Sequence, residues 1–139
     1  MSFPAMSPKV LLAGPFFNAD PAASKEFTIF YTAYNAIEIV GGYFTSDAAL
    51  AADNTNYIQL AIESGTTNAG GTGILEFDSR AAHENGVVAG DLEAFNITEG
   101  TIAKSQYVTL AYTEAGTGVL SDVMVFLYYV EGSPASSGV

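Results

Sequence analysis

The chain has 139 residues, which suits one domain that buries a hydrophobic core of its own. Four basic residues face 15 acidic ones, for a formal net charge of −11, so the basic footprint of a protein that binds nucleic acid or an anionic membrane is missing. The chain has no cysteine, which excludes disulfides, thiol chemistry and cysteine-ligated zinc, and no apolar run approaches the ~20 residues of a membrane-spanning helix.

Residues 1–25 are predicted to form an extended N-terminal arm. Proline fixes φ and lacks an N–H donor, and four prolines recur here, at positions 4, 8, 15 and 21. The segment also carries many apolar side chains, among them Phe16 and Phe17, which a free disordered tail seldom does. We therefore expect the arm to dock on its own domain, on a neighbouring copy or on a partner.

Residues 26–132 are predicted to form one β domain, followed by a small-residue tail at 133–139. Segments that are rich in β-branched and aromatic residues, or that alternate apolar and polar residues, predict strands at 26–32, 36–45, 56–64, 73–79, 91–97, 107–113 and 123–130. Gly41-Gly42 predicts a bulge, 114–118 a hairpin connection, and 46–53 is the one short helical candidate. The pattern indicates an all-β fold, an antiparallel β-sandwich or barrel.

Alternation assigns several strand residues to a face of the sheet. It places Ile58, Leu60 and Ile62 together on one face of a half-buried strand and Leu75 and Phe77 on the face opposite Ile74. It predicts that Val108, Leu110 and Tyr112 point inward.

The strand at 123–130 is apolar on both faces, so each face needs cover. Two explanations remain open: a central strand shielded by the arm, or a subunit interface. The candidate interface residues are Phe16, Phe17, Val125, Leu127 and Tyr129. An apolar contact of this kind predicts a closed homo-oligomer, because copies that each carry −11 repel one another elsewhere.

Candidate catalytic residues are few. His83 is the only histidine, and nucleophilic catalysis needs a base and an orienting group that converge in space. Glu38, Glu63, Glu76 and Glu93 lie on strand faces, where a solvated surface is the default for glutamate. We therefore expect that the chain is not an enzyme, and nothing in it predicts a cofactor.

A structural calcium ion is left open by the sequence. Asp47, Asp53 and Asn54 surround a predicted loop and can supply two or three oxygen ligands, fewer than the usual six to eight. Their spacing is not that of an EF-hand, and turn chemistry explains Asp and Asn equally well.

The block from residue 27 to residue 130 combines strand and turn patterns in a characteristic order. They are FTIFY at 27–31, IEIVGGYF at 37–44, TTNAGGTG at 66–73, IAKSQYVTL at 102–110, GTG at 116–118 and DVMVFLYY at 122–129. In this the chain resembles virion proteins of tailed bacteriophages with a jelly-roll-like β-sandwich, of the capsid-decoration or head-fibre type.

The resemblance implies a structural protein that decorates or stabilises an assembled capsid. It further implies a homotrimer bound to the major capsid protein on the virion surface, made in the host cytoplasm. The competing prediction is a non-catalytic carbohydrate- or ligand-binding β-sandwich module. Such a module needs a concave aromatic row, for which Tyr31, Tyr34, Tyr43, Tyr57 and Tyr107 are the candidates.

Overall fold

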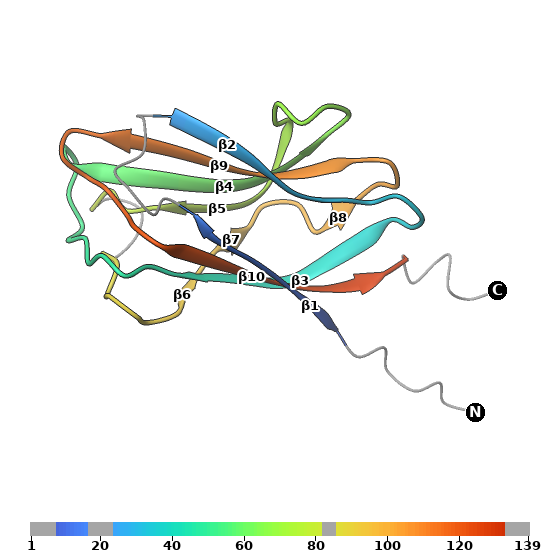
Figure 1. The fold of residues 1–139 in the computed structure, drawn as a ribbon, viewed down its shortest axis with the longest axis horizontal. Coiled ribbons are helices and arrows are strands. Elements are labelled where there is room, and N and C mark those ends of the chain that lie inside the picture. The colour runs from blue at the N-terminus through green and yellow to red at the C-terminus, as the bar shows by residue number, and fades with distance from the viewer. Residues whose placement is uncertain (1–7, 17–23, 82–85, 133–139) are drawn as a thin grey trace.

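The computed structural model describes residues 8–16, 24–81 and 86–132, and shows two antiparallel β-sheets packed face to face (Figure 1). The predicted all-β, antiparallel sandwich is confirmed. In the described part of the chain there is no helix, and so none that is long and apolar enough to cross a membrane.

Ten strands form within the described residues. Sheet A contains, in spatial order, β1 (Lys9–Phe16), β10 (Val123–Glu131), β3 (Ile37–Thr45) and β6 (Glu93–Ala94), and β8 (Thr101–Ile102) also pairs with β3. Sheet B contains β2 (Ser24–Tyr31), β9 (Tyr107–Ala115), β4 (Tyr57–Gly65), β5 (Thr72–Asp78) and β7 (Asn96–Ile97). With the two-residue strands β7 and β8 set aside, consecutive strands change sheet everywhere except at the β4–β5 hairpin. This is the strand order of a jelly roll.

The core lies between the two sheets and is built by alternation. Along β4, Ile58, Leu60 and Ile62 are buried while the residues between them are partly exposed, as predicted. Along β9, the predicted residues Val108, Leu110 and Tyr112 are likewise buried. The two central strands of sheet B therefore follow the period that their sequence encodes.

Three local predictions are corrected by the pairing. Ile74 is buried beside Leu75, because the β4–β5 register shifts at this point and turns both side chains inward. The segment 114–118 is not a hairpin, since β9 lies in sheet B and β10 in sheet A. Residues 46–53 form no helix, and Leu50 instead makes an isolated bridge with Val87.

The predicted strand at 91–97 is a crossing between the sheets. Its first half forms β6 on sheet A and its second half forms β7 on sheet B. Phe95 lies between them, buried, with its N–H donating to the carbonyl oxygen of Gly42. The crossing thus adds an aromatic side chain to the core, and the segment forms two strands of two residues each in place of one long strand.

The predicted arm contributes one strand and the start of a second to the sandwich. Residues 9–16 form β1, which pairs antiparallel with β10 and so docks on its own domain. The expected boundary at residue 25 falls inside β2, which begins at Ser24. Residues 1–7, 17–23 and the tail 133–139 lie outside the described residues.

Candidate functional site

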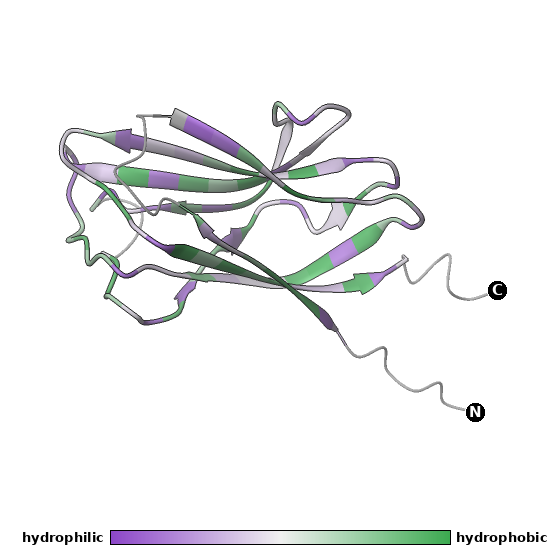
Figure 2. Cartoon of the chain, viewed as in Figure 1, coloured by the Kyte–Doolittle hydropathy of each residue, from purple (hydrophilic) through white to green (hydrophobic). Residues whose placement is uncertain are grey.

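The outer faces of the two sheets differ in chemistry, and each is a candidate site. Figure 2 shows hydrophobic residues along β1 and β10 in sheet A and alternating polar residues along β4 in sheet B. The register of the strands explains both surfaces.

The outer face of sheet A is apolar across three strands. Val10 pairs with Tyr128, and Leu12 pairs with Phe126, which in turn pairs with Tyr43. Paired residues of an antiparallel sheet share a face. We call this surface the apolar face and define it by Val10, Leu12, Tyr43, Met124, Phe126 and Tyr128.

Much of the apolar face is open to solvent. Val10 and Leu12 are each 56% exposed, Tyr43 36% and Tyr128 37%, while the rings of the two tyrosines meet edge to face at 5.8 Å. An ion pair between Lys9 and Glu131, 2.8 Å long, marks the end of β1 and β10. Contiguous exposed apolar surface is uncommon on a monomer and marks a contact site.

The predicted interface residues lie on or against the core instead. Val125 and Leu127 are buried between the sheets of a single chain, at 0% and 1% exposure, so they present no surface to another copy. The Tyr129 ring lies 5.9 Å from that of Phe30 and packs against the core. Phe16 also packs against it, with its ring 5.1 Å from that of Phe27. Phe17 lies outside the described residues.

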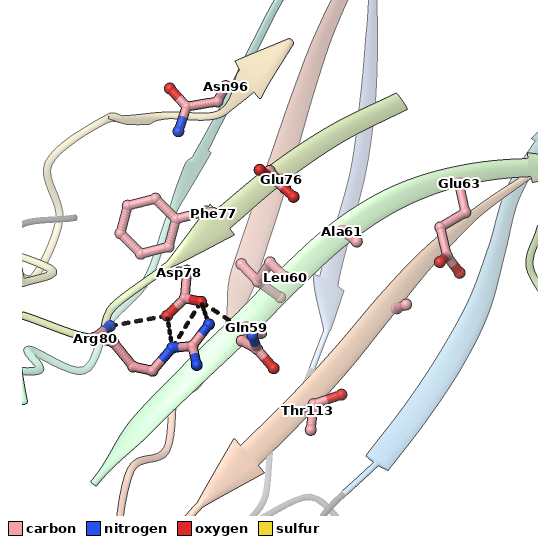
Figure 3. A pocket seen from close by; sticks show the side chains of 11 residues that line it. Gln59, Leu60, Ala61, Glu63, Glu76, Phe77, Asp78, Arg80, Asn96 and Thr113 are labelled. Carbon is pink, nitrogen blue, oxygen red and sulfur yellow. Dashed lines mark hydrogen bonds and ion pairs between the residues drawn. The ribbon is translucent and has the colours of Figure 1, made fainter. Parts of the chain in front are cut away.

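The outer face of sheet B carries a hollow of about 390 Å³ (Figure 3). One row of paired residues crosses five strands in the order Asn96, Glu76, Ala61, Ala111 and Glu26. The two alanines in the middle form a low floor, and longer polar side chains rise on either side. We call this hollow the trough; Gln59, Glu63 and Thr113 also line it.

A cluster around Asp78 closes one end of the trough. The Arg80 guanidinium donates to both carboxylate oxygens of Asp78, and the Gln59 amide donates to one of them at 3.0 Å (Figure 3). Partial burial alone would raise the pKa of Asp78, but these hydrogen bonds and the charge of Arg80 lower it to about 2. Arg80 also lies over the Tyr57 ring, 5.2 Å from its centre. The charge at this end is therefore balanced.

The other end of the trough holds two carboxyl groups in contact. Glu63 is hydrogen-bonded to the side chain of Glu26 and accepts the N–H of Gly71. Partial burial, followed by the charge of Glu26, raises the pKa of Glu63. Gly70 lies against both groups at a φ of +90°, and a β-carbon there would stand 2.6 Å from an oxygen of each. This position of the turn therefore needs glycine.

Glu26→Gln is expected to raise the melting temperature at pH 7 by about 1–3 °C, since it removes a repulsion between like charges. The pKa of Glu63 is raised above its ordinary value of 4.5 on folding. The contact with Glu26 therefore stabilises the folded chain below about pH 4.5, and this stabilisation is lost as the pH rises through the raised pKa. The gain should therefore vanish below about pH 4. Thermal unfolding of wild type, Glu26→Gln and the control Glu76→Gln across this range tests it, and equal shifts for both variants would show only the effect of net charge.

The remaining sequence candidates that lie in the described residues are not brought together as a site. His83 lies outside the described residues. The Asp53 carboxylate accepts the N–H groups of Asn56 and Thr55, which lowers its pKa and identifies it as a turn residue. Among the residues that the structure describes, no three acidic or histidine side chains gather as a metal site.

The candidate tyrosines do not form a row. The rings of Tyr31 and Tyr107 lie 4.8 Å apart and tilted to each other on sheet B, Tyr43 lies on the opposite sheet, and Tyr57 lies beneath Arg80. The trough was not predicted from the sequence, although Glu63 and Glu76 were placed on outward faces. Its floor becomes visible only when the registers of four strands are known.

No protein-family model matches the chain, and no curated protein matches it. Among solved structures, a chain of infectious bursal disease virus, Gt strain, matches with 13% identity and a TM-score of 0.35, and one of the Gx strain with 17% identity and a TM-score of 0.34. Each match covers 96% of this chain, which spans 38% and 41% of those two chains. At this identity and TM-score the likeness carries no functional assignment.

Proposed function

We propose that the chain is a structural protein of a virion, of the capsid-decoration type, that acts through protein–protein contacts and not as an enzyme. The observation that carries the proposal is the apolar face. Its six side chains come from three adjacent, hydrogen-bonded strands of sheet A. The tailed-phage class, with the major capsid protein as partner, comes from the sequence resemblance.

The apolar face is the contact between copies of the chain. Fully burying a Val or Leu side chain contributes roughly 1.5–3 kcal/mol, and Val10 and Leu12 are each about half open in the single chain. None of the six side chains of this face is charged, whereas each copy carries −11 in total. Association through this face therefore brings together the part of the surface where repulsion is weakest. The expected product is a closed homo-oligomer. The resemblance to tailed-phage virion proteins suggests that it is a trimer.

Val10→Asp is expected to convert the oligomer into folded monomers, because it places a carboxylate within the apolar face. Val88→Asp is a matched control, since Val88 is also 56% exposed and lies outside the apolar face. Light scattering at low micromolar concentration gives the mass of each variant, and circular dichroism verifies the fold.

Attachment is measured by co-sedimentation of each variant with purified capsids. The proposal predicts that wild type and Val88→Asp assemble and sediment, while Val10→Asp does neither. A wild-type monomer at every ionic strength, or a Val10→Asp variant that assembles like wild type, contradicts the role of the apolar face.

A further inference from the structure

We propose that β1 is exchanged between copies in the oligomer, so that the edge of β10 in one copy takes β1 of a second copy of this chain. In the single chain the same strand completes sheet A on its own β10. The inference rests on the contact between copies proposed above, and it names the segment that each copy contributes to its neighbour.

β1 is held by its ladder to β10 more than by the core. It stands at the edge of sheet A, with β10 as its hydrogen-bonded neighbour. None of its eight residues is buried, whereas β10 buries Val125 and Leu127 between the sheets. Its pairing with β10 is regular from Lys9 to Ala13, and the register shifts before Phe16. The sandwich therefore needs a strand at this position, but the strand can come from another copy.

The apolar face alone is too small for a stable contact between copies. A specific interface takes about 20–30 residues from each partner, and the apolar face consists of six side chains. Two of them, Val10 and Leu12, belong to β1, so the face and the exchanged strand are continuous. When β1 crosses to a neighbour, all eight of its residues and their ladder to β10 join the contact. Exchange therefore supplies surface that the face lacks.

The charge of the N-terminal segment is opposite to that of the rest of the chain. All 15 acidic residues lie at positions 20–131, and Lys9 is the one charged side chain in residues 1–19. Lys9 forms an ion pair of 2.8 Å with Glu131 at the end of β10. After exchange this ion pair joins two different copies, which each carry −11 and repel one another elsewhere. The segment that crosses is therefore the one that a neighbouring acidic copy attracts.

The connection between β1 and β2 is long enough for exchange. It runs from Phe16 in sheet A to Ser24 in sheet B, which is eight steps along the chain (Figure 1). At about 3.4 Å per step the connection reaches roughly 27 Å, while two packed sheets lie about 10 Å apart. The surplus length allows β1 to reach β10 of an adjoining copy while β2 stays in its own sheet.

Exchange leaves the hydrogen bonding of each sheet unchanged. Every copy gives one β1 and receives one, so each pair of the ladder, from Lys9 with Tyr129 to Ala13 with Val125, forms as often as before. The remaining cost is the entropy of association, which burial of the apolar face offsets. Strands passed in one direction around a ring close it, and a reciprocal exchange closes a dimer. The exchange is therefore compatible with a closed homo-oligomer.

The test is a disulfide across the ladder, in a chain that has no cysteine of its own. Ala13→Cys combined with Val125→Cys places two thiols on paired residues of β1 and β10. Val125 is buried, so this bond forms inside the sandwich and not across the apolar face. Paired Cα atoms of an antiparallel ladder lie ~4.5–5.5 Å apart, which suits a disulfide. Ala61→Cys combined with Ala111→Cys is the matched control, because these residues pair between β4 and β9 of one chain.

Both double variants are oxidised as assembled oligomers and run on a denaturing gel without reductant. Exchange predicts that the variant at positions 13 and 125 migrates at two or more chain masses, and the control at one. If the bond at 13 and 125 stays within one chain, or if these thiols remain free while the control oxidises, β1 is not exchanged. A wild type that light scattering shows to be monomeric contradicts the proposed function, whereas an intact oligomer with an intrachain bond contradicts the exchange alone.

Discussion

Leu127→Asp is expected to unfold the chain. Leu127 is 1% exposed in the middle of β10, where it pairs with Leu11 on one side and Gly42 on the other. A carboxylate at this position has no partner and little water, so the cost should exceed ~4 kcal/mol, a large part of the stability of a domain. Circular dichroism and urea denaturation measure the loss.

The matched control is Leu12→Asp. Leu12 follows Leu11, the residue of β1 that pairs with Leu127. Leu12 points to the other side of the sheet and is 56% exposed, so the same substitution should cost less than ~1 kcal/mol. It should instead weaken association, as is expected of Val10→Asp. If Leu127→Asp remained folded and only lost its oligomeric state, the buried face of β10 would have to be a subunit contact.

Val125 and Leu127, two of the predicted interface residues, lie on the buried side of β10, and the sequence pattern explains why this was not foreseen. Alternation assigns a face only where apolar and polar residues alternate, as in β4, and there the buried residues were predicted correctly. In β10 both faces are apolar, so its pattern does not tell which face is the core. The structure resolves this by packing Val125 and Leu127 against sheet B and leaving Phe126 and Tyr128 outside.

The other differences have causes that a single strand does not reveal. Ile74 turns inward because of a register shift against β4, and the crossing at residues 93–97 makes pairings too short to show a period. The trough depends on which residues stand opposite one another across four strands. By contrast, the fold class follows from the length, spacing and composition of the strands, and was predicted.

Phe44→Ala is expected to destabilise the chain by about 3–5 kcal/mol, by removing a large buried ring and leaving a cavity. Phe44 is fully buried on β3, with its ring centre 4.8 Å from that of Phe77 on sheet B and 5.2 Å from that of Phe95. It therefore joins the two sheets and the crossing between them. Urea denaturation should show a lower midpoint with an unchanged slope.

Tyr43→Ala is the control at the adjacent position. Its side chain lies on the apolar face and is 36% exposed, so the loss of stability should be well under that of Phe44→Ala. Because Phe95 packs on Phe44, hydrogen exchange at the Phe95 amide, which is bonded to Gly42, should also accelerate in Phe44→Ala. Equal losses in the two variants would mean that this aromatic cluster does not hold the sheets together, and the crossing would then owe its position to its backbone hydrogen bonds alone.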